Sequence, residues 1–451
     1  MEKEKFMQNY NKFHFIGACG VSMSGLIKHL LLNEKAVTGS DNGAENGATE
    51  LNGLGAKIYC KHSSKNAKNA DVVIYSSAIK SDNTELNYAI KHKIPTVKRS
   101  ELLGEILREF KTSVAVSGCH GKTTATAMIA NVLINAKKDP TVFLGGEDYS
   151  FGNYRNGGKD VAVAEACEYK KNFLDVKPKI SVVLNIDNDH MDAYKDMTEM
   201  LNAFTEFTKN TISVINADDA LASKIFNSTT VTFGIEKKAT YMAKNLRYNN
   251  AGYTFTAYAF GRAVGTIKLK VAGRHNVYNA LSAIAVCDVM NIPFFIIKRA
   301  LENFKGVKRR NEYIGEFFGL NCYADYAHHP KEIEATLTAF SESGEDYVTV
   351  FQPHTYSRTK LLMDDFIKVL KDKKPLIVLK TYSAREEFDE NGSAKTLFDK
   401  ICEVSGENCN YVQDQFELKE SLEKLAIGKK RAIFLGAGDV YDIAKNIIVQ
   451  K

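Results

Sequence analysis

The feature that most constrains the fold is a short glycine-containing segment that follows an apolar run. Residues 117–124 read Ser-Gly-Cys-His-Gly-Lys-Thr-Thr, directly after Ser113–Val116 and before the helix-like stretch Ala125–Leu133. A strand, a glycine loop and Gly-Lys-Thr at the start of a helix are the parts with which proteins surround nucleotide phosphates. The usual loop is longer and would place a glycine at Val116. The segment therefore predicts a parallel α/β sheet that carries a shortened phosphate loop.

Each part of this loop has a chemical role in phosphate binding. The backbone N–H groups face phosphate oxygens, Lys122 supplies a positive charge and a threonine hydroxyl reaches Mg²⁺. Because a loop lysine packs against little, we expect Lys122→Ala to abolish turnover and to leave the fold intact. The residues predicted to bind the nucleotide phosphates are Gly118, Cys119, His120, Gly121, Lys122, Thr123 and Thr124.

Size and composition exclude several classes of protein. A chain of 451 residues is expected to form two to four domains. The eight cysteines contain no Cys-x-x-Cys pair, so we expect reduced thiols rather than disulfides or a zinc site. The net charge of +6 is spread along the chain, which disfavours a nucleic-acid partner. No apolar run is long enough for a membrane span and no signal-peptide pattern opens the chain, so cytoplasmic residence is expected.

Alternating apolar and helical stretches divide the chain into three predicted blocks, residues 1–108, 109–307 and 308–451. Strand, helix and strand recur at the spacing of βαβ units, which build parallel sheets. The second block differs in its later part, because residues 240–271 alternate apolar and polar around a turn. That alternation predicts antiparallel strands.

The turn after the first predicted strand is a candidate for a second phosphate site. It begins Gly17-Ala18-Cys19-Gly20, and the dinucleotide fingerprint Gly-x-Gly-x-x-Gly is broken by Cys19 and Ser22. Asp41 ends the next strand, where an acid either bonds a ribose hydroxyl or caps a turn. We expect a diphosphate ligand at this edge of the sheet. The candidate substrate-binding residues are Gly17, Gly20, Ser22, Met23, Asp41, Ser76 and Ser77.

Polar side chains follow two further strands of the second block. Glu165 ends the run that begins at Asp160, and His190 lies in the polar segment after Ile180–Leu184. Carboxylate and hydroxyl oxygens suit Mg²⁺, and one histidine among them is tolerated. A carboxylate and an imidazole from these two segments, together with a threonine hydroxyl of the phosphate loop, are therefore candidate ligands of a divalent metal. Surface acids or capping residues are the alternative interpretation.

Two further motifs lie near the end of the second block. Asn276 and Asn279 are three residues apart and share one face of a predicted helix, although asparagine is also a favoured N-cap. Arg310 ends a basic run at the presumed domain boundary, where it could neutralise a transferring phosphoryl group. A solvated basic face is the alternative.

The third block places polar residues after two strands, at the edge where such sheets bind ligands. Asp325–Pro330 reads Asp-Tyr-Ala-His-His-Pro, and Phe351–Thr359 reads Phe-Gln-Pro-His-Thr-Tyr-Ser-Arg-Thr. Neither spacing fits a zinc motif. The chain also lacks the Gly-x-Ser-x-Gly elbow, which argues against a serine hydrolase.

Taken together, these stretches resemble the Mur ligase family over nearly the whole chain. The resemblance rests on segments in the family's order: Gly118–Thr124, Glu165–Glu168, Asn185–Asp192, Gly273–Asn279, Val307–Arg310, Asp325–Pro330 and Phe351–Thr359. Two departures stand out. Cys19 and Ser22 carry side chains where the family often has none, and the run Tyr169–Lys171 is less acidic than in many members. The second departure leaves a functional role for Glu168 open and does not affect the expectation for Glu165.

The resemblance implies a fold and a reaction. The fold would be α/β with three domains: an N-terminal Rossmann-like domain for a UDP-sugar, a central ATPase domain with a phosphate loop and a mostly parallel sheet, and a C-terminal Rossmann-like domain. The last two motifs are similar to those of the alanine-adding member. The implied reaction is ATP-driven amide formation in peptidoglycan precursor synthesis, through an acyl phosphate on the lactoyl carboxylate of UDP-N-acetylmuramate, which the amine of L-alanine attacks.

The resemblance also implies roles for single residues, with ATP and Mg²⁺ as the cofactors. Asn276, Asn279 and Asp325 would face the nucleotide, and Tyr326, His354 and Arg358 would line the amino-acid site. Arg358 could pair with the alanine carboxylate. The residues implied to be catalytic are Lys122, Glu165, His190, Arg310 and Asp325, and the implied metal ligands are Thr123, Glu165 and His190.

Three other functions are compatible with parts of the pattern. A ligase that recycles muropeptides would add a tripeptide instead of alanine, and would differ around His354 and Arg358. A non-catalytic relative would bind the nucleotide sugar only, which the set of intact polar residues disfavours. An NAD-dependent enzyme is disfavoured by the broken glycine fingerprint. The sequence does not indicate an oligomeric state.

Overall fold

The computed structural model describes residues 9–42, 45–188, 193–249, 252–342, 344, 346–373, 375–384, 386–405 and 409–449. Within them the chain divides into two compact units. The first comprises residues up to Arg247 together with Thr254–Leu269 and Asn276–Phe304, and the second comprises Tyr248–Tyr253, Lys270–His275 and the chain from Lys305 onward. The first unit contains most of two sheets and the second contains the third sheet. The predicted α/β class is confirmed.

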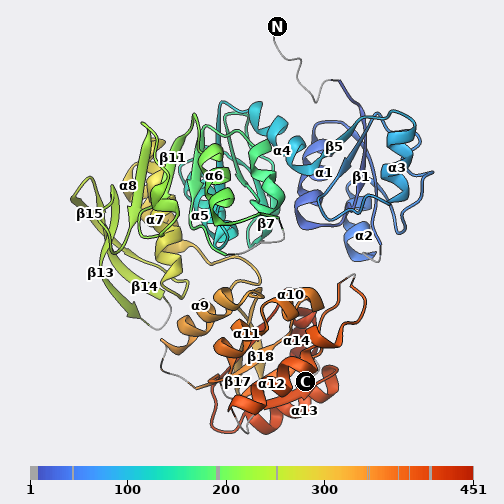
Figure 1. Cartoon of the computed structure of the whole chain (residues 1–451). Coiled ribbons are helices and arrows are strands. Elements are labelled where there is room, and N and C mark those ends of the chain that lie inside the picture. The colour runs from blue at the N-terminus through green and yellow to red at the C-terminus, as the bar shows by residue number, and fades with distance from the viewer. Residues whose placement is uncertain are drawn as a thin grey trace. The chain divides into compact units, whose positions relative to one another are not determined.

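The first sheet has five strands in the order β3-β2-β1-β4-β5 (Figure 1). All neighbours pair in parallel, and the order reverses between β1 and β4. Ligands of such sheets bind at the carboxyl ends of the strands beside this reversal. The elements are β1 (Lys12–Ile16), α1 (Val21–Leu32), β2 (Ala36–Ser40), α2 (Glu45–Gly53), β3 (Lys57–Tyr59), β4 (Val72–Tyr75), α3 (Thr84–Lys91), β5 (Thr96–Lys98) and α4 (Arg99–Arg108).

The second sheet has ten strands, and the strand that feeds the phosphate loop lies inside it. The order is β15-β14-β13-β12-β11-β10-β6-β9-β7-β8. Strands β14 and β15 pair antiparallel, as the alternation of residues 240–271 predicts. The strands are β6 (Thr112–Ser117), β7 (Thr141–Asp148), β8 (Gly152–Arg155), β9 (Val161–Glu165), β10 (Ile180–Val183), β11 (Ile212–Asn216), β12 (Thr230–Gly234), β13 (Tyr241–Asn249), β14 (Gly252–Ala259) and β15 (Arg262–Lys268).

The helices of the second sheet bury its apolar strands. Helix α5 follows β6 and is buried along most of its length, which explains why its sequence is apolar nearly all round. The 3₁₀ segment η2 has left-handed φ values of 50° at Lys170 and 59° at Lys171. The helical elements are α5 (Lys122–Asn135), η2 (Tyr169–Asp175), α6 (Met197–Phe207), η3 (Ala222–Lys224), α7 (His275–Val289) and α8 (Phe294–Asn303).

The first and second sheets share one hydrophobic core, because buried residues of both form a single cluster. Polar contacts join them as well: the Ser77 hydroxyl donates to Oδ1 of Asn172 at 3.1 Å, and the Ser100 hydroxyl donates to Asp175 at 2.6 Å. Helix α4 approaches η2 so closely that a Cβ on Gly104 would overlap the carbonyl oxygen of Asp175. This glycine is therefore required for close backbone packing.

The third sheet has six strands in the order β16-β17-β21-β18-β19-β20, and only β16 pairs antiparallel. Separate apolar clusters cover its two faces, as expected for a sheet with helices on both sides. The elements are β16 (Glu312–Phe317), β17 (Leu320–Asp325), α9 (Pro330–Ser341), β18 (Tyr347–Phe351), α10 (Tyr356–Leu361), α11 (Met363–Leu370), β19 (Leu376–Leu379), η4 (Glu390–Gly392), α12 (Ala394–Ser405), β20 (Cys409–Val412), α13 (Gln415–Leu425), β21 (Arg431–Leu435) and α14 (Val440–Val449).

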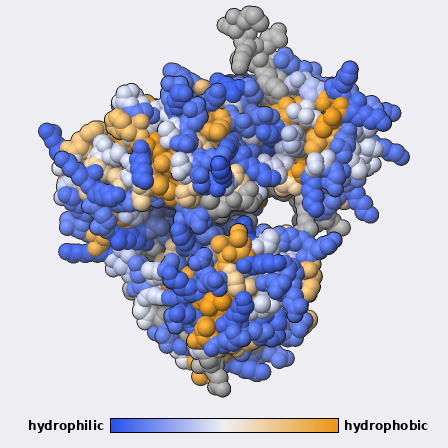
Figure 2. Space-filling view, in the orientation of Figure 1, coloured by the Kyte–Doolittle hydropathy of each residue, from blue (hydrophilic) through white to orange (hydrophobic). Residues whose placement is uncertain are grey.

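The face of the molecule in Figure 2 is mostly hydrophilic, with apolar residues in separate patches. Large apolar side chains with more than two thirds of their surface exposed include Phe226, Phe260, Phe295, Leu361 and Phe388. Across the described ranges, no helix combines the length and apolarity that a membrane span requires.

Candidate active site

The predicted phosphate loop joins β6 to α5 and needs both of its glycines. Gly118 has a φ of 142° and Gly121 a φ of 83°, in the left-handed region that side chains disfavour. A Cβ on Gly121 would also lie 2.7 Å from Oδ1 of Asn279. The loop ends at the N-terminus of α5, where unpaired N–H groups and the helix dipole favour an anion. The geometry agrees with the predicted shortened loop.

One asparagine fixes the shape of this loop. Asn185 follows β10, and its Oδ1 accepts a hydrogen bond from the His120 backbone at 2.9 Å while its Nδ2 donates to the His120 carbonyl at 3.0 Å. Its own carbonyl accepts from the Cys119 N–H at 3.3 Å. The loop backbone is therefore held on its β10 side before any nucleotide binds.

Lys122 lies in a buried ion pair rather than in an open loop. Its Nζ donates to the Gly118 carbonyl at 2.5 Å, to the Cys119 carbonyl at 3.1 Å and to Oε1 of Glu168 at 3.0 Å. The Glu168 side chain is fully buried, and that of Lys122 is 18% exposed. Burial alone would lower the pKa of Lys122, but the Glu168 carboxylate outweighs it and raises this pKa. Lys122 is therefore charged at any physiological pH.

The ion pair bears on two expectations. The sequence leaves a functional role for Glu168 open, and the structure places its carboxylate in direct contact with the phosphate-loop lysine. Lys122 was expected to pack against little, yet it neutralises a buried charge. Removing only one partner of such a pair leaves the other uncompensated, so Lys122→Ala is expected to lower stability as well as activity.

Glu165 lies at the end of β9 and touches the first turn of α5. Its Oε2 accepts a hydrogen bond from the Thr123 hydroxyl at 3.1 Å, and its Oε1 accepts from the Gly145 N–H at 2.5 Å. A Cβ on Gly145 would lie 2.9 Å from Oε2 of Glu165. The structure thus brings together two of the three predicted metal ligands, and the third, His190, lies outside the described residues.

The donors present fit a magnesium ion. Thr123 and Glu165 offer two adjacent oxygens, and Mg²⁺ is commonly held by one or two protein oxygens together with substrate phosphates. The described part of the chain contains no group of three or more histidine, cysteine, aspartate or glutamate side chains arranged for a metal. A site of this kind would be completed by the nucleotide.

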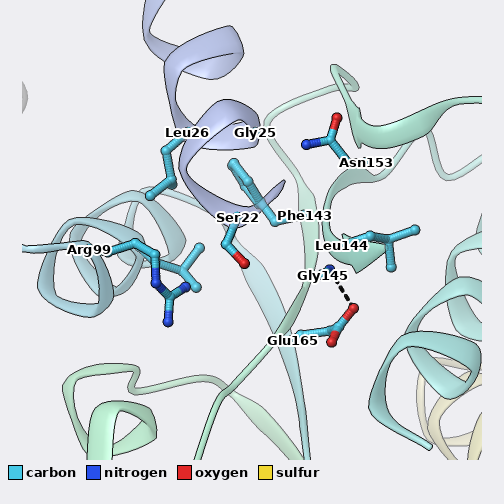
Figure 3. A pocket seen from close by; sticks show the side chains of 10 residues that line it. Ser22, Gly25, Leu26, Arg99, Phe143, Leu144, Gly145, Asn153 and Glu165 are labelled. Carbon is cyan, nitrogen blue, oxygen red and sulfur yellow. Dashed lines mark hydrogen bonds between the residues drawn. The ribbon is translucent and has the colours of Figure 1, made fainter. Parts of the chain in front are cut away.

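A pocket connects Glu165 to the first sheet. Figure 3 shows Ser22 of α1, Arg99 of α4 and Glu165 around it, with the dashed bond from Gly145 to Glu165. Its lining residues are Ser22, Gly25, Leu26, Arg99, Leu103, Phe143, Leu144, Gly145, Asn153 and Glu165. Ser22, a predicted substrate-binding residue, and Glu165, a predicted metal ligand, therefore border one pocket.

The glycine turn after β1 is held by the end of β2. The N–H groups of Gly17 and Ala18 both donate to the Ser40 carbonyl, at 2.8 and 3.0 Å. The Cys19 N–H donates to Oδ2 of Asp41 at 2.9 Å. Asp41 therefore shapes this turn, which is the capping alternative that the sequence left open; contact with a ribose stays a prediction.

Other predicted substrate residues differ in their surroundings. The Met23 side chain is 3% exposed and packs in the core, on the helical face of α1 that turns inward. Substrate contact by Met23 stays a prediction. Ser77 follows β4 and bonds to Asn172, and the Ser76 carbonyl accepts from the Ile79 N–H at 3.0 Å.

Asn276 and Asn279 lie on one face of α7, as predicted. Nδ2 of Asn279 donates to Oδ1 of Asn276 at 3.0 Å, and Asn279 packs against Gly121. The neighbouring Tyr278 hydroxyl donates to Asp218 at 3.0 Å. Asp218 also accepts three backbone N–H bonds from residues 235–237, and its pKa is lowered because these bonds outweigh burial. The loop 235–237 is thereby tied to the helix that carries the asparagine pair.

In the second unit, Arg310 and Asp325 are neighbours. Oδ2 of Asp325 accepts from the Asn311 N–H at 2.7 Å, and Oδ1 accepts from the Ala327 N–H at 2.8 Å. Burial raises the pKa of Asp325, and the positive charge of Arg310 opposes that rise. The guanidinium of Arg310 also lies 5.1 Å from the centre of the Tyr326 ring, within cation–π range.

The predicted amino-acid residues of the second unit meet in one cluster. Nη1 of Arg358 donates to Nδ1 of His354 at 3.1 Å, and the His354 ring stacks on Tyr382 with centroids 5.6 Å apart. The His328 ring lies 5.7 Å from that of His354. Burial, helped by the charges of His328 and Arg358, lowers the pKa of His354 to about 4. His354 is therefore neutral at pH 7 and carries its single ring proton on Nε2, because Nδ1 accepts from Arg358.

Several residues of these clusters were not found from the sequence. Arg99 borders the pocket, and its only sequence signal was a basic residue at the start of a helix after a strand end. Asp218 carried no signal, because its partners are backbone groups. Glu168 stood in a quoted segment but could not be paired with Lys122 by spacing alone.

Comparison with known proteins identifies the family of this chain. Residues 12–111 match a Mur ligase family catalytic domain, residues 116–287 match a Mur ligase middle domain, and residues 309–438 match a Mur ligase glutamate ligase domain. The order of the matches follows the order of the three sheets along the chain.

Curated relatives and solved structures agree. UDP-N-acetylmuramate–L-alanine ligase of Acetivibrio thermocellus is 42% identical over 455 residues, covering 98% of this chain and 97% of the relative. The enzyme of the same name from Aquifex aeolicus is 38% identical, with 96% coverage of both. The crystal structure of UDP-N-acetylmuramate–alanine ligase from Thermotoga maritima has a TM-score of 0.84 at 32% identity, covering 97% of this chain and 98% of that one. A murein peptide ligase of Psychrobacter arcticus shares the fold, with a TM-score of 0.72 at 19% identity over 97% and 98% of the two chains. This protein therefore belongs to the Mur ligase family.

Proposed function

We propose that the protein joins L-alanine to the lactoyl carboxylate of UDP-N-acetylmuramate, with conversion of ATP to ADP and phosphate. The observation that carries this assignment is the pocket in which Ser22, at the start of α1 after the glycine turn, and Glu165 beside the phosphate loop border the same space. Such a pocket would bring the carboxylate end of a UDP-sugar within reach of the γ-phosphate of ATP. Full-length relatives with this activity support the assignment.

In the first step the sugar carboxylate would attack the γ-phosphoryl group and form an acyl phosphate. Phosphoryl transfer depends on positioning and charge neutralisation more than on covalent help from the protein. Lys122, held by Glu168, would face the β- and γ-phosphates. Arg99 would offset the negative charge of the sugar substrate inside the pocket. Arg310 of the second unit would neutralise the charge that develops on the transferring group.

A bound magnesium ion would supply positive charge that offsets the negative charge of the nucleotide phosphates. Thr123 and Glu165 are the described residues that would hold it, with His190 as the further predicted ligand. Asn276 and Asn279 would face the nucleotide from α7, and Asp325 would contact its ribose.

In the second step the alanine amine would attack the acyl phosphate carbonyl and release phosphate. Arg358 would pair with the alanine carboxylate. Because the pKa of His354 is lowered to about 4, this histidine adds no second positive charge beside that arginine. Tyr326 would form a wall of the small pocket that receives the methyl group. A wall can exclude large side chains, but glycine would be disfavoured only by about 1–3 kcal/mol.

The proposed division of labour follows the predicted domain boundaries, with residues 1–108 for the UDP-sugar, 109–307 for ATP and 308–451 for the amino acid. Because the reaction consumes ATP, we also propose that the protein acts in the cytoplasm. The recycling of muropeptides is disfavoured, since the named relatives of high identity are alanine ligases and the recycling enzyme shares only the fold.

The decisive experiment is phosphate release measured with each substrate omitted in turn. We expect release to require UDP-N-acetylmuramate, ATP, Mg²⁺ and L-alanine together. Release that proceeds with a tripeptide but not with L-alanine would overturn the assignment in favour of recycling. Binding of UDP-N-acetylmuramate without any release would indicate a non-catalytic relative.

A further inference from the structure

The turn that carries Arg310 has an unusual backbone. Arg309 has a φ of 59° and Asn311 a φ of 51°, so left-handed residues that are not glycine flank Arg310 on both sides. Such conformations cost of order 1–3 kcal/mol each and persist only where the surroundings fix them. The turn is closed by a bond from the Arg310 N–H to the Val307 carbonyl at 3.2 Å. The direction of Arg310 therefore depends on what holds its two neighbours.

Most of the contacts that hold the turn involve Arg309. Its N–H donates to Oε2 of Glu312 at 2.7 Å, and its carbonyl accepts from the Tyr326 N–H at 2.8 Å. Its Nη2 donates to the carbonyl of Gly438 at 2.7 Å. The guanidinium lies 5.2 Å from the ring of Tyr326 and 4.9 Å from the ring of Tyr441, so two aromatic rings and one carbonyl hold it.

The glycine that Arg309 bonds is itself packed against the predicted amino-acid site. A Cβ on Gly438 would lie 2.5 Å from Cγ of Tyr382 and 2.6 Å from Oε1 of Gln352, so no larger residue fits without movement. Tyr382 stacks on His354, and the two residues also form a parallel β-bridge. Gly438 thus has the arginine turn on one side and the support of His354 on the other.

We propose that Arg309 is a positioning residue that, through Gly438 and Tyr382, holds Arg310 and His354 in one fixed arrangement. Arg310 would act on the phosphoryl group and His354 would border the incoming amino acid, so the inference rests on the proposed function. The two adjacent arginines would then have different tasks. Arg310 faces the chemistry, whereas Arg309 is committed to the structure around it, with its Nε buried and without a hydrogen-bond partner among the described residues.

The test compares Arg309→Met with Arg309→Lys and with Arg299→Met, which removes the same charge from an exposed position on α8. A shift of about 1 Å in a catalytic group can cost roughly 100-fold in rate, so we expect Arg309→Met to lower kcat roughly 10- to 100-fold. The KM for UDP-N-acetylmuramate should stay within about twofold of wild type, because Arg309 in this role makes no contact that contributes to ground-state binding of this substrate. The KM for alanine should rise. Lysine keeps the charge and a donor but not the planar fork, so it should recover part of kcat.

Gly438→Ala tests the same connection from its other side, without removing any charge. The added methyl group is expected to displace Tyr382 and to raise the KM for alanine while lowering kcat. Rates are divided by the folded fraction at the assay temperature. A purely structural role would lower the melting temperature of Arg309→Met but leave kcat per folded enzyme within about twofold of wild type, and that result would overturn the proposal.

Crystal structures of the two variants provide a readout that needs no substrate. We expect the Arg310 turn to move in Arg309→Met and the Tyr382 ring to move in Gly438→Ala. If wild type shows no alanine-dependent phosphate release, the proposed function fails, but these structures still decide whether Arg309 positions its neighbours. An unmoved Arg310 and an unmoved Tyr382 would overturn the inference by themselves.

Discussion

The chain uses a strand, a glycine turn and a helix twice, and the two versions differ in where their positive charge comes from. The loop between β6 and α5 contains its own cation, Lys122, which is paired with the buried Glu168. The turn between β1 and α1 contains no basic side chain in Gly17–Gly20. Among the residues that line the pocket beside this turn, the cation is Arg99, which comes from α4.

The backbone conformations of the two turns also differ. In the β6 loop, Gly121 caps α5 in the left-handed region with a φ of 83°, whereas Gly20 caps α1 in an extended conformation with φ −61° and ψ 139°. The β6–α5 loop is held by the Asn185 side chain, and the β1–α1 turn is held by the Asp41 carboxylate and the Ser40 carbonyl. A lysine inside a loop suits close contact with a reacting phosphate. An arginine from a neighbouring helix suits binding of a diphosphate or a carboxylate whose own bonds are not broken at that point.

The largest expected effect is at Lys122, the cation within the β6–α5 loop. Lys122→Ala should lower kcat by about 1,000-fold or more, because a positioned charge on the transferring phosphate is lost. It should also lower the free energy of unfolding by about 3 kcal/mol, since the buried Glu168 carboxylate loses the positive charge of Lys122. Phosphate release and urea denaturation measure the two effects.

The matched control for this substitution is the double variant Lys122→Ala with Glu168→Gln. Removing the second charge should restore most of the lost stability and none of the activity. If the double variant is no more stable than Lys122→Ala, the ion pair does not stabilise the loop in the way described.

The next largest effect is expected at Arg99, the pocket cation that comes from α4. Arg99→Met should raise the KM for UDP-N-acetylmuramate roughly tenfold, with the KM for ATP unchanged, because a charge-assisted contact to the sugar substrate is lost. Arg108→Met is the control, since it removes an exposed arginine from the same helix. Equal behaviour of the two variants would contradict a role for Arg99 in the pocket.

A smaller effect is expected where the first turn is held. Asp41→Asn weakens the bond to the Cys19 N–H and should raise the KM for UDP-N-acetylmuramate about threefold. Asp71 makes similar carboxylate bonds to the N–H groups of Asn11 and Lys12 beside the other end of β1, so Asp71→Asn is matched in chemistry. Isothermal titration should find weaker sugar binding in the first variant only. An equal loss in both would indicate a general loss of domain stability.

The smallest effect concerns the stability of the two helices. Helix α1 buries His29, whereas α5 contains no histidine. Burial lowers the pKa of His29 to about 4, and its Nδ1 lies 3.0 Å from the Tyr154 hydroxyl. Between pH 4 and the unfolded pKa of about 6.5, the unfolded chain binds a proton that the folded chain does not. The contribution of His29 to stability is therefore complete above pH 6.5 and falls as the pH drops. Melting temperatures at pH 7, 6 and 5 should fall less steeply in His29→Gln, and parallel curves would exclude this contribution.

The architecture was accessible from the sequence because its strands are continuous apolar runs. Val72–Tyr75 and Ile180–Val183 are buried on both faces of parallel sheets, and such strands cannot be confused with solvated loops. Met23 shows the limit of this reasoning. A motif places it beside the glycine turn, but the direction of its side chain depends on the rotation of α1 against the core.

The site was accessible where a residue acts through its own segment and hidden where it acts through a partner. Lys122, Glu165 and Asn279 follow from their positions at a loop, a strand end and a helix start. Glu168 and Arg309 do not, because their importance comes from contacts with residues far away in the sequence: an ion pair with Lys122 and a hydrogen bond to Gly438. Spacing along a chain carries no information about such distant contacts.

The close approach of Gly104 to Asp175 also bears on how parts of such enzymes can be exchanged between relatives. Helix α4 and the η2 segment fit without room for a single methyl group, and Gly25 of α1 also lies against Asn153, although a Cβ there would meet Asn153 at an ordinary contact distance of 3.6 Å. A hybrid that takes its first sheet from one parent and its second from another would have to match both surfaces at once. A crossover near Phe304, where the compact first unit ends, leaves these fitted surfaces within one parent.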